Sequence, residues 1–211
     1  MPTSTFFRLP EEKRQRLTDA AWEEFSRVGL ADVSINKIIC AARIPRGSFY
    51  QYFSGKDDLF RYLMTGAKEF FIGCLTEKLR ETDGDLFSVP MKIYDQFLEE
   101  NSGSGQQAGA FVRVLQLNQG LDLQKQLFDQ REVVPDEILE IMDLTRFRRE
   151  DTVFLENLFG MTMFCTATAV IAALTNPTQR EHERRMLNDR IDILAHGSLR
   201  PDLIDQEGGR Q

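Results

Sequence analysis

Residues 34–59, SINKIICAARIPRGSFYQYFSGKDDL, contain the pattern of two short helices separated by a tight turn. Ser34 is a good helix N-cap, and the isoleucines that follow it fall on one helical face, so a first helix is expected from Ser34 to Ala42. Pro45 cannot continue that helix but fits the first turn of another one, which predicts a second helix from Pro45 to Tyr52. The stretch therefore predicts a helix-turn-helix unit.

The second of these helices has a single apolar stripe. Phe49 and Phe53 lie four residues apart and are expected to face inward. The other side chains can form hydrogen bonds: Arg46, Ser48, Tyr50, Gln51 and Tyr52. Lys56 opens a third helix and places a cation where a phosphate could lie. One face of the second helix is thus expected to meet a polar partner.

These residues resemble the N-terminal DNA-binding domain of the TetR family of transcriptional regulators. The resemblance covers roughly residues 10–62, including a first helix expected from Glu11 to Val28 and ended by Gly29. The family pattern falls on Ser34, Ile38, Ile39 (where alanine is usual), Gly47, Ser48, Phe49, Tyr50, Tyr52, Phe53 and Lys56. Two positions depart from it, because Arg43 stands at a usual glycine and Pro45 at a usual serine. A positive φ at Arg43 would cost roughly 1 kcal/mol.

The resemblance implies a set of DNA contacts. Contacts to backbone phosphates are expected from Ser34, Lys37, Ser48, Tyr50, Tyr52 and Lys56. Arg46 and Gln51 are expected to read base edges, because arginine pairs with guanine and glutamine with adenine in the major groove. Gly47 would let the helix backbone come close to the DNA. Each residue taken alone also has a structural interpretation: it can cap a helix, pack its ring over the core or carry a surface charge. The occurrence of all of them in the order of the family pattern favours DNA binding.

Composition and charge agree with a DNA-binding N-terminal part. The chain of 211 residues has a net charge of −7, yet residues 1–63 carry ten Lys and Arg against eight Asp and Glu. His182 and His196 are its two histidines, and no P-loop, dinucleotide-binding turn or nucleophile elbow occurs. The sequence therefore predicts no enzyme, no catalytic residue, no metal site and no cofactor.

The rest of the chain also has a helical pattern. We expect an all-α protein with a three-helix DNA-binding domain at residues 1–62 and a larger helical domain for ligand binding and dimerisation at residues 63–211. Further helices are expected at Lys56–Glu81, Asp85–Glu100, 108–118, 121–131, 135–147, Arg149–Leu174 and Thr178–His196, with a polar loop at 101–107.

The segment from Asn157 to Gln179 contains no charged residue. Its apolar part, Leu158–Leu174, is interrupted by threonines and is shorter than the ~20 residues that a membrane-spanning helix needs, so a buried helix is favoured. Cys165, Ala169 and Ala173, spaced four residues apart, give it a small-residue edge for close helix packing. The resemblance implies that the last two helices form a homodimer interface.

A small-molecule effector is a second implication of the resemblance. Bulky side chains suit an apolar or aromatic molecule, and the candidate pocket residues are Phe111, Leu115, Phe154, Met161 and Phe164. Asn118, Gln116 and Asn157 are candidate polar anchors. Each of these residues has plain core packing as its alternative interpretation.

The sequence thus predicts a sequence-specific, DNA-binding transcriptional regulator. We expect a ligand-responsive repressor that binds an inverted-repeat operator in double-stranded DNA as a homodimer. The alternative is a non-catalytic helical interaction protein without sequence-specific DNA binding. Three scattered cysteines and the lack of a signal-peptide pattern indicate a cytoplasmic protein without a membrane anchor.

Overall fold

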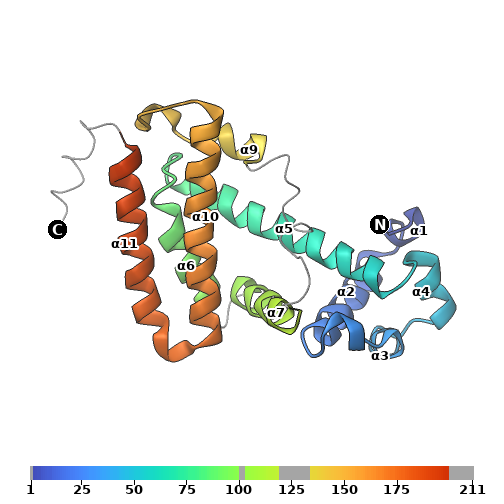
Figure 1. Cartoon of the computed structure of the whole chain (residues 1–211). Coiled ribbons are helices and arrows are strands. Elements are labelled where there is room, and N and C mark those ends of the chain that lie inside the picture. The colour runs from blue at the N-terminus through green and yellow to red at the C-terminus, as the bar shows by residue number, and fades with distance from the viewer. Residues whose placement is uncertain (1, 100–102, 119–133, 200–211) are drawn as a thin grey trace. The chain divides into compact units, whose positions relative to one another are not determined.

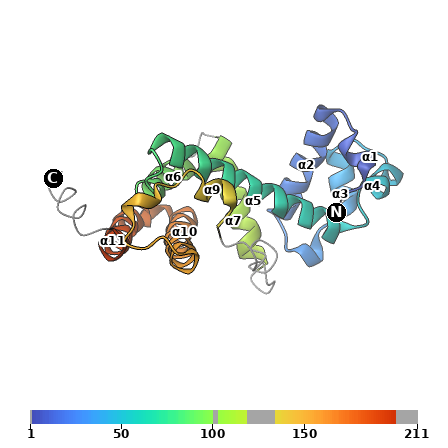
Figure 2. The same ribbon diagram turned by 90° about the horizontal axis from the view of Figure 1, so that it is seen from above.

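The computed structural model describes residues 2–99, 103–118 and 134–199, and Figures 1 and 2 show it from two directions. Within these residues every named element is a helix, and the one isolated β-bridge joins Phe147 to Leu199. The all-α class expected from the sequence is confirmed.

The described residues form two compact units. Residues 2–71 and 107–118 make up the first, and residues 72–99, 103–106 and 134–199 make up the second. Two helices, α5 (Lys56–Glu81) and α7 (Gly103–Leu117), therefore have residues in both units. The division falls after Phe71, and the expected domain boundary after residue 62 stays a prediction.

The first unit is built around an aromatic core. Its other helices are α1 (Ser4–Phe7), α2 (Glu11–Phe25), η1 (Leu30–Asp32), α3 (Ile35–Ala41) and α4 (Arg46–Tyr52). Phe49 and Phe53, the predicted inward stripe of α4, are both fully buried. They pack in one cluster with Phe25, Ile38 and Phe60. This core fixes α4 with its remaining faces outward.

The turn between α3 and α4 contains a left-handed residue. Arg43 has a φ of 54°, so the conformation that the sequence left open at this position is the left-handed one. The amide of Arg43 donates to the carbonyl of Cys40 over 3.1 Å, and the amide of Ile44 donates to that of Ile39 over 3.0 Å. These two bonds form a Schellman turn, which offsets the strain at Arg43 by satisfying the last carbonyls of α3.

In the second unit, α10 (Thr152–Thr175) packs against both α6 (Val89–Leu98) and α11 (Arg180–Ser198). The three helices lie side by side in Figure 1. The Tyr94 hydroxyl of α6 donates to the carbonyl of Arg180 over 2.6 Å, and the Arg184 guanidinium makes two bonds of 3.0 Å to the Asp95 carboxylate. These bonds hold the N-terminal part of α11 against α6.

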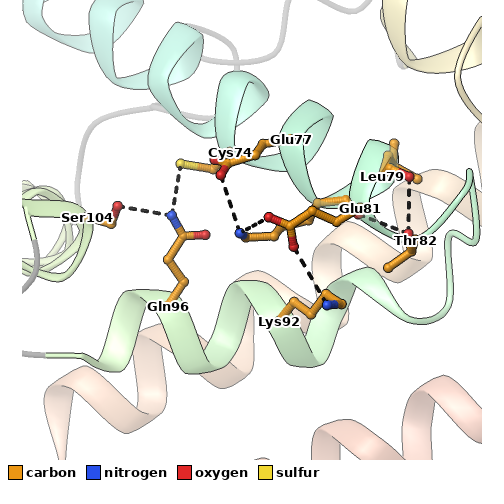
Figure 3. Close-up of polar contacts among 9 residues, drawn as sticks. Cys74, Glu77, Leu79, Glu81, Thr82, Lys92, Gln96 and Ser104 are labelled. Atoms are coloured by element: carbon orange, nitrogen blue, oxygen red, sulfur yellow. Dashed lines mark hydrogen bonds and ion pairs between the residues drawn. The ribbon is translucent and has the colours of Figure 1, made fainter.

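A second set of polar contacts joins the C-terminal part of α5 to α6 (Figure 3). The Lys78 ammonium lies 2.7 Å from the Glu81 carboxylate and 3.6 Å from that of Glu77. Glu81 also pairs with Lys92 of α6 over 3.7 Å. The Gln96 amide donates to the Ser104 hydroxyl over 3.1 Å. These contacts hold α6 and the first residues of α7 against α5.

Among the described helices, α10 is the one long and apolar enough to cross a membrane by length and composition. Its buried side includes Ala169 and Ala173, both without exposed surface. The hydroxyls of Thr162 and Thr166 donate to the carbonyls four residues earlier, over 2.8 and 2.7 Å. Ala169 and Ala173 therefore lie on the packed side of α10, in agreement with the small-residue edge expected there.

The segments at 103–107 and 135–147 differ from what the sequence predicted. Residues 103–107 were expected in a loop, but α7 begins at Gly103. One helix was expected over 135–147, whereas the chain forms the short α9 (Asp136–Leu139) and η2 (Leu144–Arg146). The expected helix is interrupted at Asp143. The Asp143 amide donates to the carbonyl of Gly84, and its carboxylate accepts a bond from the Thr145 amide. The helix expected at 121–131 lies outside the described residues.

Candidate nucleic-acid interface

The start of α3 is held by a buried carboxylate. Ser34 caps the helix, and its hydroxyl accepts a bond from the Lys37 amide over 3.4 Å. The Ser34 amide donates to the carboxylate of Glu24, a residue that is 5% exposed. The second carboxylate oxygen of Glu24 accepts two bonds from Arg27, of 3.0 and 2.6 Å. Glu24 was not singled out from the sequence, because its role depends on a partner ten residues away.

Burial alone would raise the pKa of Glu24. The hydrogen bonds from Arg27 and from the Ser34 amide act in the opposite direction and hold the pKa below the ordinary 4.5. The charged form is therefore favoured by the fold, so Glu24 stabilises the unit above pH 4.5 and loses that contribution as pH falls further.

Acidification is expected to unfold the first unit in a way that depends on Glu24. Urea titrations followed by the fluorescence of Trp22, the one tryptophan of the chain, would measure its free energy of unfolding between pH 3 and pH 7. Stability should fall below pH 4.5 in the wild type, and the Glu24→Gln variant should be less stable at pH 7 with a flatter profile. Parallel pH profiles for the two proteins would contradict this role.

The outward face of α4 is accessible. Arg46, Gly47, Tyr50 and Gln51 are exposed, Tyr50 to 48%, and Ser48 is partly exposed. In the neighbouring α3, Lys37 is exposed as well. A short helix with a buried aromatic stripe and a polar outer face has the form of a helix that enters the DNA major groove.

Arg46 is oriented by contacts within the helix pair. Its guanidinium donates to the side-chain oxygen of Asn36 in α3 over 2.9 Å. It also lies over the Tyr50 ring, 5.9 Å from the ring centre. Both partners belong to the exposed surface of the two helices, so the cation is held at that surface and not within the core.

Two of the residues expected to contact DNA, Lys56 and Tyr52, make contacts within the protein. The Lys56 ammonium donates to the carbonyl of Ala31 and ties the start of α5 to η1, so it is not the lone cation inferred from the sequence. An ammonium has three donors, and a phosphate contact by Lys56 stays a prediction. Tyr52 is 9% exposed, with its ring against that of Phe6. Its phosphate contact also stays a prediction.

A β-carbon at Gly47 would meet no atom within 4 Å. Packing in the protein alone therefore does not require glycine. The Gly47→Ala variant is expected to gain up to about 1 kcal/mol in free energy of unfolding, because alanine favours a helix. Its affinity for operator DNA is expected to fall about tenfold if the backbone lies against the duplex. Denaturant titration and fluorescence anisotropy would measure both, and unchanged DNA affinity would remove Gly47 from the interface.

Comparison with known proteins supports this interface. Residues 17–63 match the family model described as bacterial regulatory proteins, tetR family. The transcriptional regulator AcuR of Cereibacter sphaeroides is 31% identical over 87 residues, which cover 41% of this chain and 39% of AcuR. The HTH-type transcriptional regulator AcrR of Shigella flexneri is 36% identical over 90 residues, covering 42% and 41% of the two chains. The likeness to the TetR family thus covers the helix-turn-helix part of the chain, residues 17–63.

These curated matches span only about two fifths of each relative. The fold likeness extends further. The structure of SmeT, the repressor of the Stenotrophomonas maltophilia multidrug efflux pump SmeDEF, aligns with 90% of this chain and 94% of that one at a TM-score of 0.60. The sequence identity is 16%, so this similarity concerns the fold. The family match contains every residue expected to contact DNA.

The structure does not bring the five expected effector residues into one unit. Phe111 and Leu115 pack against the core of the first unit, with the Phe111 ring 5.0 Å from that of Phe71. In the second unit, Phe154 lies under two arginine side chains, while Met161 and Phe164 are 55% and 65% exposed. A pocket lined by all five residues stays a prediction.

Asn118 has a structural role that the sequence did not reveal. It is 6% exposed, its amide nitrogen donates to the carbonyl of Val114, and its oxygen accepts from the Leu30 amide, both over 2.8 Å. A β-carbon at Gly29 would lie 3.1 Å from the carbonyl of Leu117. Asn118 thus fastens the end of α7 to the chain before α3. The suggested role of Asn118 as a polar anchor for a ligand stays a prediction.

Proposed function

We propose that this chain is a sequence-specific, DNA-binding transcriptional regulator that binds an inverted-repeat operator as a homodimer. The observation that carries the proposal is α4, where Phe49 and the Phe53 that follows the helix are buried while Arg46, Tyr50 and Gln51 are exposed. The two curated relatives are named as transcriptional regulators, and the family match includes this helix. The role requires no catalytic group and no cofactor, and its DNA partner implies a cytoplasmic protein.

Dimerisation through the last two helices is supported by exposed apolar side chains. Val153, Met161 and Phe164 are 65%, 55% and 65% exposed and share one face of α10 by their spacing. On α11, Met186 and Ile193 lie seven residues apart and are 36% and 70% exposed. An apolar surface of this kind is typical of a subunit interface. A twofold dimer would present two copies of α4 to successive major grooves, about 34 Å apart.

A ligand-responsive repressor is the form of regulation that we propose. α5 and α7 each have residues in both compact units. Displacement of either helix by an apolar or aromatic effector in the second unit would therefore move residues that belong to the first. The Asn118 contact with Leu30 would pass a shift of α7 to the chain before α3. The effector must bind the DNA-bound and DNA-released states with different affinity for this to regulate.

Salt dependence tests the DNA-binding role. Affinity for duplex DNA should fall roughly 10³-fold between 50 and 200 mM salt, because a dimer that makes six or more phosphate contacts releases counterions. Fluorescence anisotropy with a labelled duplex would measure this. Weak binding that responds little to salt would favour the alternative, a helical interaction protein without DNA recognition.

A further inference from the structure

The C-terminal end of α4, the helix proposed to read DNA, is capped by Thr3. A helix leaves its last carbonyls without partners inside the helix. The Thr3 hydroxyl donates to the carbonyl of Gln51 over 2.6 Å, and the Thr3 amide donates to that of Tyr52 over 3.0 Å. One residue thus satisfies two consecutive carbonyls at the end of a seven-residue helix.

Phe6 anchors this contact in the core. Its side chain has no exposed surface. Its ring centre lies 4.9 Å from that of Phe53, which directly follows α4, and 5.0 Å from that of Tyr62 in α5. The Phe6 amide donates to the carbonyl of Thr3 over 3.0 Å, so the buried ring and the capping residue belong to the same turn. The position of Thr3 is therefore set by packing and not by a loose tail.

Such support matters because α4 is short. An isolated helix of seven residues is unstable in water, so tertiary contacts must hold it. Phe49 fixes the inward face, while the exposed Gln51 lies in the last turn, next to the carbonyls that Thr3 binds. A frayed last turn would displace Gln51 and Tyr52 from the DNA.

We infer that Thr3 and Phe6 are positioning residues for DNA recognition, which rests on the function proposed above. The segment from Thr3 to Phe7 holds the last turn of α4 in its reading conformation. Neither residue carries a charge, so the segment acts on the geometry of the reading helix and leaves the electrostatic attraction to DNA unchanged.

The test compares Thr3→Val, which removes the hydroxyl at nearly constant shape, with Thr3→Ser, which keeps it. In the full-length protein, Thr3→Val should lower affinity for a selected operator duplex on the order of fivefold, the factor expected for one hydrogen bond. Thr3→Ser should restore it, and binding to an unrelated duplex should not change. Phe6→Ala should have a larger effect than Phe7→Ala, since Phe7 is 54% exposed.

A measurement without DNA separates this inference from the proposed function. The Phe53 amide is bonded to the carbonyl of Phe49 and the Ala42 amide to that of Ile38, both over 2.9 Å. In Thr3→Val, hydrogen exchange by NMR should accelerate at Phe53 and not at Ala42. The inference would be overturned if exchange at Phe53 were unchanged. It would also be overturned if binding to operator DNA and binding to unrelated DNA were weakened equally. Failure of the wild type to select any DNA sequence would instead refute the proposed function, and exchange at Phe53 would still decide the positioning role.

Discussion

Replacing Arg46 and Gln51 together by alanine is expected to remove the preference of the protein for its operator over unrelated DNA. Each side chain is exposed on α4, and Arg46 is held at the surface by Asn36 and Tyr50. A bidentate base contact contributes about 1 to 3 kcal/mol of discrimination. A dimer would lose each contact in two half-sites, so operator affinity should fall at least 10³-fold.

Competition anisotropy with operator and unrelated duplexes would measure this loss. Arg185→Ala is the charge-matched control, because it removes one cation from α11 in the second unit and should leave discrimination unchanged. If the double variant bound both duplexes with equally reduced affinity, Arg46 and Gln51 would contribute charge or stability without reading bases.

Replacing Phe164 by aspartate is expected to convert the dimer into monomers. Its side chain is 65% exposed in the protomer, so folding should survive, whereas a charge on the apolar face of α10 would be buried in a dimer. A central aromatic interface residue contributes about 2 kcal/mol or more, and twofold symmetry counts it twice. The dimer dissociation constant should rise roughly 10³-fold, with a matching loss of operator affinity.

Sedimentation velocity across a range of protein concentrations would measure the assembly state. The control is Asn188→Asp, which adds a charge to an exposed position of α11 on the side away from Met186 and Ile193. A Phe164→Asp protein that remained dimeric would place the interface elsewhere.

Local signals in the sequence account for much of the DNA-binding unit. The cap at Ser34, the proline that restarts the chain and the four-residue spacing of Phe49 and Phe53 each act through near neighbours, so they could be interpreted without a structure. The sequence left the conformation of Arg43 open, and the structure shows a positive φ there. The expected DNA contacts themselves remain to be measured.

The features that sequence reasoning missed depend on partners far along the chain. Asn118 binds Leu30, and Thr3 binds Gln51 and Tyr52. No periodicity or local motif indicates such pairs. The Gly-Ser-Gly sequence at 103–105 favoured a loop by composition, yet these residues begin α7, because tertiary contacts override weak local preferences.

Selection of bound duplexes from a random DNA pool by the purified protein at moderate salt tests the central claim most directly. The account predicts enrichment of an inverted repeat whose half-site centres lie one DNA turn, about 34 Å, or a multiple of it apart, and loss of that enrichment in the Arg46 and Gln51 double variant. If the wild-type protein, cleared of bound small molecules by refolding, enriched no sequence, the assignment of α4 as a DNA-reading helix would be contradicted.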